Sequence, residues 1–146
     1  MRQFNTLLFL AAIFVAAACH STKYSPSKLP EDQLLFGYGG GFTGKVSTVL
    51  LLENGQIFRQ GDTETSFSEL SKVKKREAHR FFEAAEDLKL GEMKFDHPGN
   101  LYQFIELHDD GKTSRIVWGD DKSPVNQKVK DLFIALNDLA KTGIKR

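Results

Sequence analysis

Residues 101–118 read LYQFIELHDDGKTSRIVW, and this stretch predicts a β-hairpin. Apolar and polar residues alternate on both sides of Asp110-Gly111, a dipeptide suited to the two positive-φ positions of a type I′ turn. A two-residue loop of this kind fixes the register of its strands. The predicted pairs are His108 with Thr113, Leu107 with Ser114, Glu106 with Arg115, Ile105 with Ile116 and Phe104 with Val117.

This register divides the hairpin into two faces. We expect helices to cover the face that bears Leu101, Ile105, Leu107, Ile116 and Trp118. The opposite, open face then carries Tyr102, Phe104, Val117 and the Glu106/Arg115 pair. A half-apolar sheet face of this kind is covered by the N-terminal segment of the chain, used in self-association, or used to bind a partner.

A second hairpin is predicted over residues 45–60, where Asn54-Gly55 separates two runs rich in Val, Leu, Ile and Phe. A type I′ turn here sets Leu51 opposite Phe58 and Leu50 opposite Arg59. A short strand over residues 35–38 precedes this hairpin.

Two amphipathic helices complete the pattern. Residues 71–88 place Ala78, Phe81, Phe82, Ala85 and Leu88 at three- and four-residue spacing, with Gly91 as a stop. In the second helix Ser123 is the cap and Pro124 the first residue. Its apolar stripe is Val125, Val129, Leu132, Phe133, Leu136, Leu139 and Ala140. We therefore expect one α+β domain over residues 34–146, an antiparallel sheet of four to five strands with two helices packed on one face.

The composition excludes several classes of protein. The chain has 146 residues, of which 40% are hydrophobic and 12 are Phe, and its formal net charge is +1. Disordered chains have few aromatic residues and a large net charge, and nucleic-acid binders carry a strongly basic face. A single cysteine excludes an intramolecular disulfide and a zinc site with several thiolates. We expect no nucleic-acid partner, no metal and no cofactor.

The first 18 residues predict a lipoprotein signal peptide. Arg2 is followed by an apolar run over residues 7–18, which as a helix is about 18 Å long and too short to cross a bilayer core of roughly 30 Å. Residues 15–19, VAAAC, resemble a bacterial lipobox, and this resemblance implies an acylated N-terminus at Cys19.

Residues 19–33 are predicted to be a tether between the lipid and the domain, because they are rich in Ser and Pro and lack an apolar period. His20 after the cysteine resembles the pattern of lipoproteins sent to the outer membrane. We expect a protein of the bacterial cell envelope, on the periplasmic face of the outer membrane. The charge run of Lys72, Lys74, Lys75 and Arg76 fits an anionic lipid headgroup, an acidic partner or an ordinary solvated face.

The candidate binding residues lie in two turns and on the open face. Residues 39–44, GGGFTG, predict a tight positive-φ connection between strands, not a phosphate loop, because no Lys-Ser/Thr follows. In this connection Phe42 is either an exposed contact for a partner or an ordinary core residue. The candidates are Gly40, Gly41, Phe42, Thr43 and Gly44, with His97, Pro98 and Asn100 from the neighbouring turn and Tyr102 and Phe104 from the open face.

The arrangement of these features resembles the emfourin group, small bacterial inhibitors of thermolysin-like metallopeptidases, and small lipoproteins of Bacteroidota-type bacteria. The resemblance covers about residues 36–139. It rests on the 40–44 turn before a strand, a helix ending near Leu88-Lys89-Leu90, the hairpin from Tyr102 through Asp110-Gly111-Lys112 to Trp118-Gly119-Asp120, and a final helix led by Pro124. It implies a protein inhibitor that presents residues 40–44 to a peptidase.

Three functions follow from these observations. The first is a lipid-anchored, non-catalytic protein whose domain binds another protein. The second is an emfourin-like inhibitor of thermolysin-like metallopeptidases, with Phe42 in a substrate side-chain pocket. The third is an enzyme of unrecognised type that uses Asp96, His97 and neighbouring acidic residues.

Overall fold

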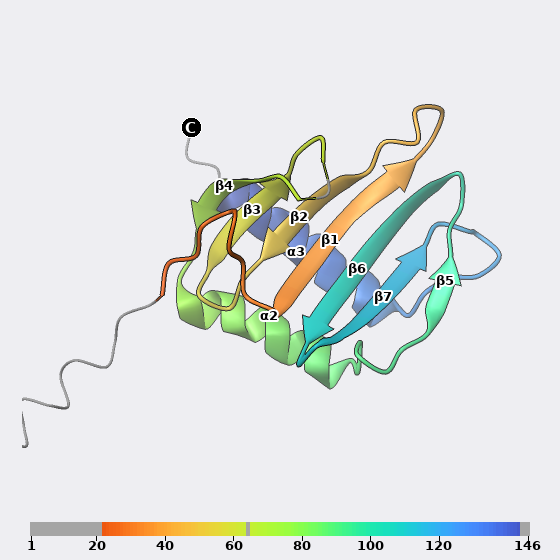
Figure 1. The fold of residues 1–146 in the computed structure, drawn as a ribbon. Helices are drawn as coiled ribbons and strands as arrows, with labels where there is room; N and C mark the ends of the chain where they lie inside the picture. Colours follow the sequence, from red (N-terminus) through yellow and green to blue (C-terminus); the bar gives the residue numbers. More distant parts are fainter. Residues whose placement is uncertain (1–21, 64, 144–146) are drawn as a thin grey trace, which may run out of the picture.

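The structure is a computed structural model that describes residues 22–63 and 65–143. Seven strands form one sheet in the order β4-β3-β2-β1-β6-β7-β5, and two helices cross one of its faces (Figure 1). The elements are β1 (Gln33–Gly40), β2 (Ser47–Leu51), β3 (Gln56–Gln60), β4 (Phe67–Lys72), α2 (Lys75–Asp87), β5 (Phe95–His97), β6 (Leu101–Asp109), β7 (Lys112–Trp118) and α3 (Gln127–Gly143).

The expected sheet of four to five antiparallel strands is therefore wrong. The sheet is mixed, because β5 runs parallel to β7 whereas every other neighbouring pair is antiparallel. Strand β1 was expected to be a short first strand. It lies at the centre and joins the two hairpins, pairing with β2 on one side and β6 on the other.

The β6–β7 hairpin has the predicted register, with Glu106 opposite Arg115 and Phe104 opposite Val117. Asp110 and Gly111 have φ values of 47° and 73°. Both central positions of the turn are thus left-handed, as a type I′ turn requires.

The predicted register of the β2–β3 hairpin is wrong by one residue. Leu51 pairs with Ile57 and Leu50 with Phe58. Only Gly55, with φ 92°, is left-handed, and its N–H donates to the carbonyl of Leu52 at 2.9 Å. The loop is therefore a three-residue connection with a left-handed glycine at its end, which is longer by one residue than a type I′ loop.

Strands β4 and β5 were not predicted. In β4 a bulge lies between the pairs Ile57–Ser71 and Phe58–Glu69, so Leu70 is an extra residue. A bulge breaks the alternation by which strands are found in a sequence. Strand β5 has three residues, too few for any pattern, and it is held by parallel pairing to β7.

The helices differ from prediction at their ends. Helix α2 begins at Lys75 because residues 67–72 are in β4, and it ends in a Schellman motif with Lys89 at φ 53°, before Gly91. The cap of α3 is Asn126 in place of Ser123: its Oδ1 accepts the N–H of Lys128 at 2.9 Å. None of the helices in the described part of the chain is long and apolar enough to cross a membrane.

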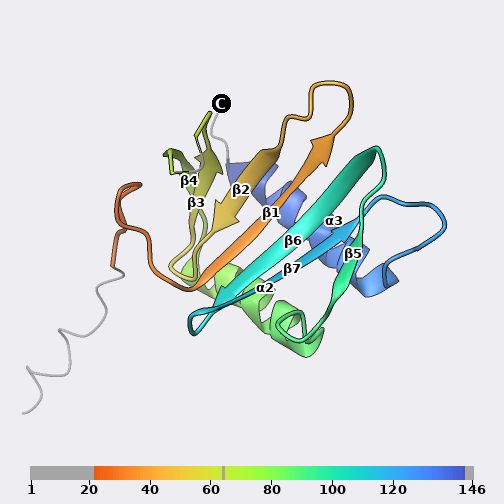
Figure 2. The same ribbon diagram turned by 45° about the vertical axis from the view of Figure 1, so that its right-hand side comes forward.

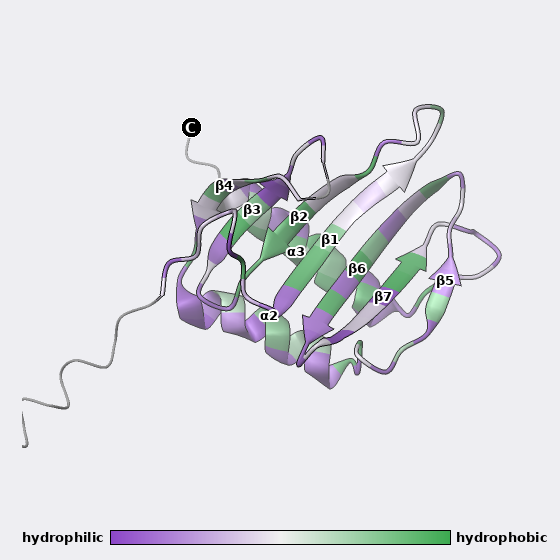
Figure 3. Ribbon diagram, in the orientation of Figure 1, coloured by the Kyte–Doolittle hydropathy of each residue, from purple (hydrophilic) through white to green (hydrophobic). Residues whose placement is uncertain are grey.

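The core has two parts, one on each side of the sheet. The larger part lies under the helices, and the predicted stripe residues from Val129 to Ala140 are buried in it. Helix α2 is also amphipathic, and Figure 3 shows hydrophobic and hydrophilic residues alternating along it. The smaller part lies on the open face and consists of Leu35, Leu50, Leu52 and Phe58. Phe58 contributes to this part because the observed register pairs it with Leu50.

Candidate protein-binding site

The β1–β2 connection forms a projecting tip at one end of the sheet, seen in orange at the upper right of Figure 1. We call residues 40–44 the tip. The N–H of Gly44 donates to the carbonyl of Gly41 at 3.2 Å, which closes a turn with Phe42 and Thr43 at its centre. Gly40, Gly41 and Gly44 have φ values of 94°, 72° and 61°. These left-handed conformations favour glycine, so the sequence of the tip matches its backbone.

Phe42 is fully exposed at the end of the tip. Phe42 is therefore not a core residue, which was one of the two predictions for this position. Three further large apolar side chains near this end of the sheet are exposed: Tyr38, Val46 and Leu101. The tip end of the domain thus carries apolar surface that no part of the described chain covers.

The turn at residues 97–100 lies against the tip. The N–H of Gly41 donates to the carbonyl of Asn100 at 2.7 Å. A Cβ atom on Gly40 would lie 2.2 Å from that carbonyl oxygen, so glycine is needed for the close approach. This contact joins two turns that are far apart in the sequence, and it supports the tip from one side.

The other predicted binding residues differ in how much of their side chains is exposed to solvent. His97 and Pro98 are exposed, and the His97 ring packs edge-on against Phe95 at 4.7 Å between centroids. Tyr102 is half-buried. Phe104 is buried, and the Arg115 guanidinium lies over its ring at 3.9 Å from the centroid. Phe104 therefore supports the open face and offers little surface to a partner.

Asp96 and His97 are not brought together as a catalytic pair. They are consecutive residues of β5, and consecutive strand residues point to opposite faces of a sheet. Both side chains are exposed.

Glu106 lies at the centre of a charged network on the open face. Its two oxygens contact Arg115 Nη1 at 2.7 Å and His108 Nε2 at 2.6 Å. Burial raises the pKa of Glu106, but the hydrogen bonds and positive charges of His108 and Arg115 outweigh burial and hold this pKa below its ordinary value. A carboxylate in this state is a weak base.

The network of Glu106, His108 and Arg115 borders a hollow of about 830 Å³ on the open face. Thr48, Gln60 and Phe67 also line this hollow.

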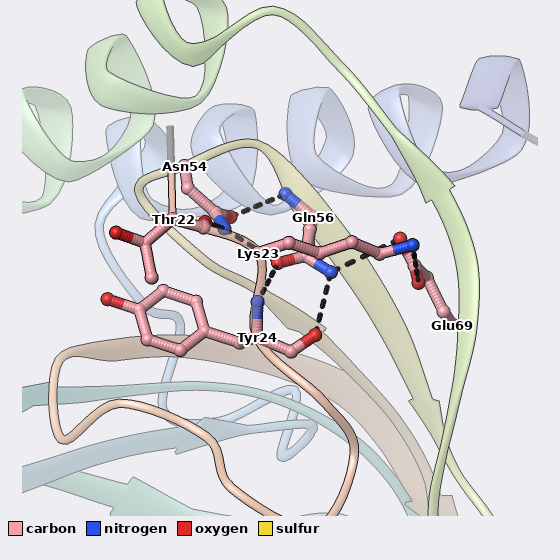
Figure 4. Close-up of polar contacts among 6 residues, drawn as sticks. All are labelled: Thr22, Lys23, Tyr24, Asn54, Gln56 and Glu69. Atoms are coloured by element: carbon pink, nitrogen blue, oxygen red, sulfur yellow. Dashed lines mark hydrogen bonds and ion pairs between the residues drawn. The ribbon is translucent and has the colours of Figure 1, made fainter. Parts of the chain in front are cut away.

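The opposite end of the sheet contains a polar cluster that the sequence did not reveal (Figure 4). Gln56 is fully buried, and its side chain holds the backbone of Tyr24: Oε1 accepts the N–H at 2.7 Å and Nε2 donates to the carbonyl at 3.0 Å. Asn54 Nδ2 donates to the carbonyl of Thr22 at 2.6 Å. We call this end, with residues 22–24 and 53–56, the docked end.

Within the described part of the predicted tether, Thr22 and Tyr24 are held to the domain by hydrogen bonds to Asn54 and Gln56. Tyr24 and Leu29 lie against the small open-face core, and a turn closes between Ser25 and Lys28. Three alternatives were predicted for the open face. Cover by the N-terminal segment is observed over the part of this face that carries the small core. Cys19 and the predicted signal peptide lie outside the described residues.

Neither a model of a known protein family nor a curated protein sequence matches this chain. The resemblance to the emfourin group therefore stays a prediction.

Proposed function

We propose that this chain is a lipid-anchored, non-catalytic protein of the bacterial cell envelope that binds another protein through the tip. Cys19 carries the lipid in this proposal, and the periplasmic face of the outer membrane is the proposed location. The observation that carries the binding function is the complete exposure of Phe42 on a turn held by hydrogen bonds.

Two contributions to the free energy of protein–protein binding support a binding role for the tip. Aromatic side chains at the centre of an interface commonly supply a large share of the binding free energy. A turn whose shape is fixed before binding loses little conformational entropy. The tip combines both properties, because three left-handed glycines shape it and the Gly41–Asn100 hydrogen bond supports it.

Site-specific crosslinking tests this proposal in the full-length protein in its own cells. Phe42 is replaced by the photocrosslinking amino acid p-benzoylphenylalanine, and Ile134 is replaced in a matched control. Ile134 is also an exposed apolar residue, but it lies on α3, away from the tip. We expect one defined crosslinked protein from position 42 and none from position 134. Identical products from both positions, or none from either, would overturn the proposal.

The emfourin-like alternative makes the same tip an inhibitor. Exposure of Phe42 on a shaped loop favours it, since protein inhibitors hold such loops in the active-site cleft of a peptidase. The purified protein is titrated against a thermolysin-like metallopeptidase secreted by its own organism. Inhibition at micromolar concentration that is lost in Phe42→Ala supports this alternative. Full peptidase activity at these concentrations excludes it and leaves the binding proposal in place.

A further inference from the structure

The docked end controls how far the domain can lie from its lipid. Cys19 and Thr22 are three residues apart, and three extended residues span at most about 11 Å. If residues 19–33 were all a free tether, the fourteen residues to Gln33 would span up to about 50 Å. The hydrogen bonds of Thr22 and Tyr24 to Asn54 and Gln56 therefore remove most of the expected reach.

The tip lies at the other end of the sheet. Strand β1 starts beside the docked end at Gln33 and reaches the tip at Gly40, and its eight residues span roughly 24 Å. In Figures 1 and 2 the described part of the N-terminal segment lies at the left of the sheet, and the tip projects at the top. We call Thr22, the residue nearest to Cys19 at the docked end, the attachment point. The attachment point and the proposed binding residue Phe42 are thus separated by the full length of the sheet.

Basic side chains surround the attachment point. Lys75 lines the same hollow as Thr22 and Asn54, and Val73 donates its N–H to the carbonyl of Gly55 at 2.9 Å, which brings the start of α2 to this end. Lys74, Lys75 and Arg76 are exposed and form no ion pair within the described residues.

The acidic side chains near the attachment point are mostly engaged with groups of the protein itself. Glu69 is 3.7 Å from Lys23, and Glu53 is 3.9 Å from His79. Asp32 accepts the N–H of Asp110 at 3.2 Å. Glu31, next to Asp32, and Glu77, in the first turn of α2, are exposed. Unpaired cations next to a lipid-bearing segment are suited to the phosphate groups of a membrane surface, and a basic patch adds to the binding of an acyl chain.

We infer that the docked end rests on the membrane, with Lys74, Lys75 and Arg76 against lipid phosphates and the tip directed away from the bilayer. This inference rests on the proposed lipid anchor at Cys19. It adds that the partner of the tip meets the domain at a distance from the bilayer of up to the length of β1, which excludes a partner buried within the membrane.

Paramagnetic lipids test this orientation. The acylated protein, isotopically labelled and purified from membranes, is placed in nanodiscs of phosphatidylethanolamine and phosphatidylglycerol that contain a gadolinium-chelating lipid. We expect the amide NMR signals of Asn54, Lys74 and Lys75 to be lost and those of Phe42 and Thr43 to be retained. Equal loss at the two ends would overturn the inference.

Further variants distinguish the two causes of this orientation, the short reach to Cys19 and the basic side chains at the start of α2. A flexible Gly/Ser linker of about twelve residues, inserted between Ser21 and Thr22, keeps both the anchor and the domain but extends the reach by about 20 Å. We expect it to restore the signals at the docked end in part, because the basic residues then act without the short reach. Unchanged loss in the linker variant that also carries Lys74→Gln and Lys75→Gln would overturn the inference. Lys74→Gln with Lys75→Gln is expected to restore them in part, whereas Lys94→Gln with Lys122→Gln, which changes exposed lysines elsewhere, is not. Equal effects of the two pairs would overturn the role of the lysines.

The anchor is tested independently. Cys19→Ser should abolish acylation and release the protein from the membrane fraction. A Cys19→Ser protein that stays with the membranes contradicts the lipid anchor of the proposed function. An acylated protein whose two ends lose signal equally contradicts only the orientation.

Discussion

The two ends of the sheet differ in which kind of side chain is buried and which kind is exposed. At the docked end polar side chains are buried, with Gln56 fully enclosed and Asn54 nearly so, and each bonds to backbone groups of the N-terminal segment. At the tip an apolar side chain, Phe42, is exposed. Buried polar groups with complete hydrogen bonding hold one segment in one place. Exposed apolar groups add nothing to folding but are available to a partner.

The contrast between two phenylalanines tests this difference most strongly. Phe58 is fully buried beneath the docked segment, so Phe58→Ala should lower the free energy of unfolding by about 4 kcal/mol. Phe42→Ala should change it by less than about 0.5 kcal/mol, because no buried contact is removed. Urea unfolding followed by circular dichroism measures both. A large loss of stability in Phe42→Ala would show that the tip is part of the folding core.

The next largest effect is expected at Gln56. Gln56→Ala leaves the N–H and carbonyl of Tyr24 without their partners, and the free energy of unfolding should fall by about 3 kcal/mol. Gln127→Ala is the matched control, since Gln127 is exposed and its side chain donates to Asp131, and its effect should stay below about 0.5 kcal/mol. Hydrogen exchange at Tyr24 should become fast in Gln56→Ala alone. Unchanged protection would mean that other contacts hold the segment.

Two glycines of the tip sharpen the comparison at the other end. Gly40→Ala should cost about 2 kcal/mol, because its Cβ would meet the Asn100 carbonyl oxygen at 2.2 Å and φ is 94°. Gly44→Ala should cost about 1 kcal/mol, since its φ is 61° but no atom lies within 4 Å of the new Cβ. Thermal unfolding measures the difference. Equal costs would indicate that the tip moves freely relative to the 97–100 turn.

The smallest expected effect concerns Glu106, on the open face between the two ends. Its pKa in the folded protein is below the ordinary value of 4.5, so its carboxylate stabilises the fold above that pH. This contribution is lost as the pH falls below about 4.5 and through the lower folded pKa. Wild type should therefore lose more stability than Glu106→Gln between pH 6 and pH 3, measured by urea unfolding at each pH. Parallel pH profiles would contradict the assigned shift.

The two hairpins show what local sequence can and cannot predict. Asp110-Gly111 forms the expected two-residue turn, and the β6–β7 register follows from it. Asn54-Gly55 is a similar dipeptide, yet only its glycine is left-handed. Asn54 instead uses its side chain: Oδ1 accepts the N–H of Gln56 at 2.9 Å and Nδ2 donates to Thr22. A partner 32 residues away thus contributes to the conformation of the turn, and no short-range rule includes it.

The candidate site was predicted in part for the same reason. The glycine turn follows from a short run of residues, whereas the sequence left the exposure of Phe42 open against burial in the core. The support from Asn100 was expected only as a neighbouring loop, and the burial of Phe104 depends on where Arg115 lies across the strand pair. The docked end was missed, because Gln56 and Tyr24 carry no motif that identifies them as partners.

The sequence by itself determined the elements that depend on neighbouring residues. The two helices, the β6–β7 hairpin and the glycine turn of the tip follow from periodicities and turn preferences that act over a few positions. Only the tertiary structure decided that β1 is central, that β4 and β5 complete the sheet and that Tyr24 and Leu29 pack on the open face. These features depend on hydrogen bonds and burial between segments distant in the chain, which form only once the whole sheet is assembled.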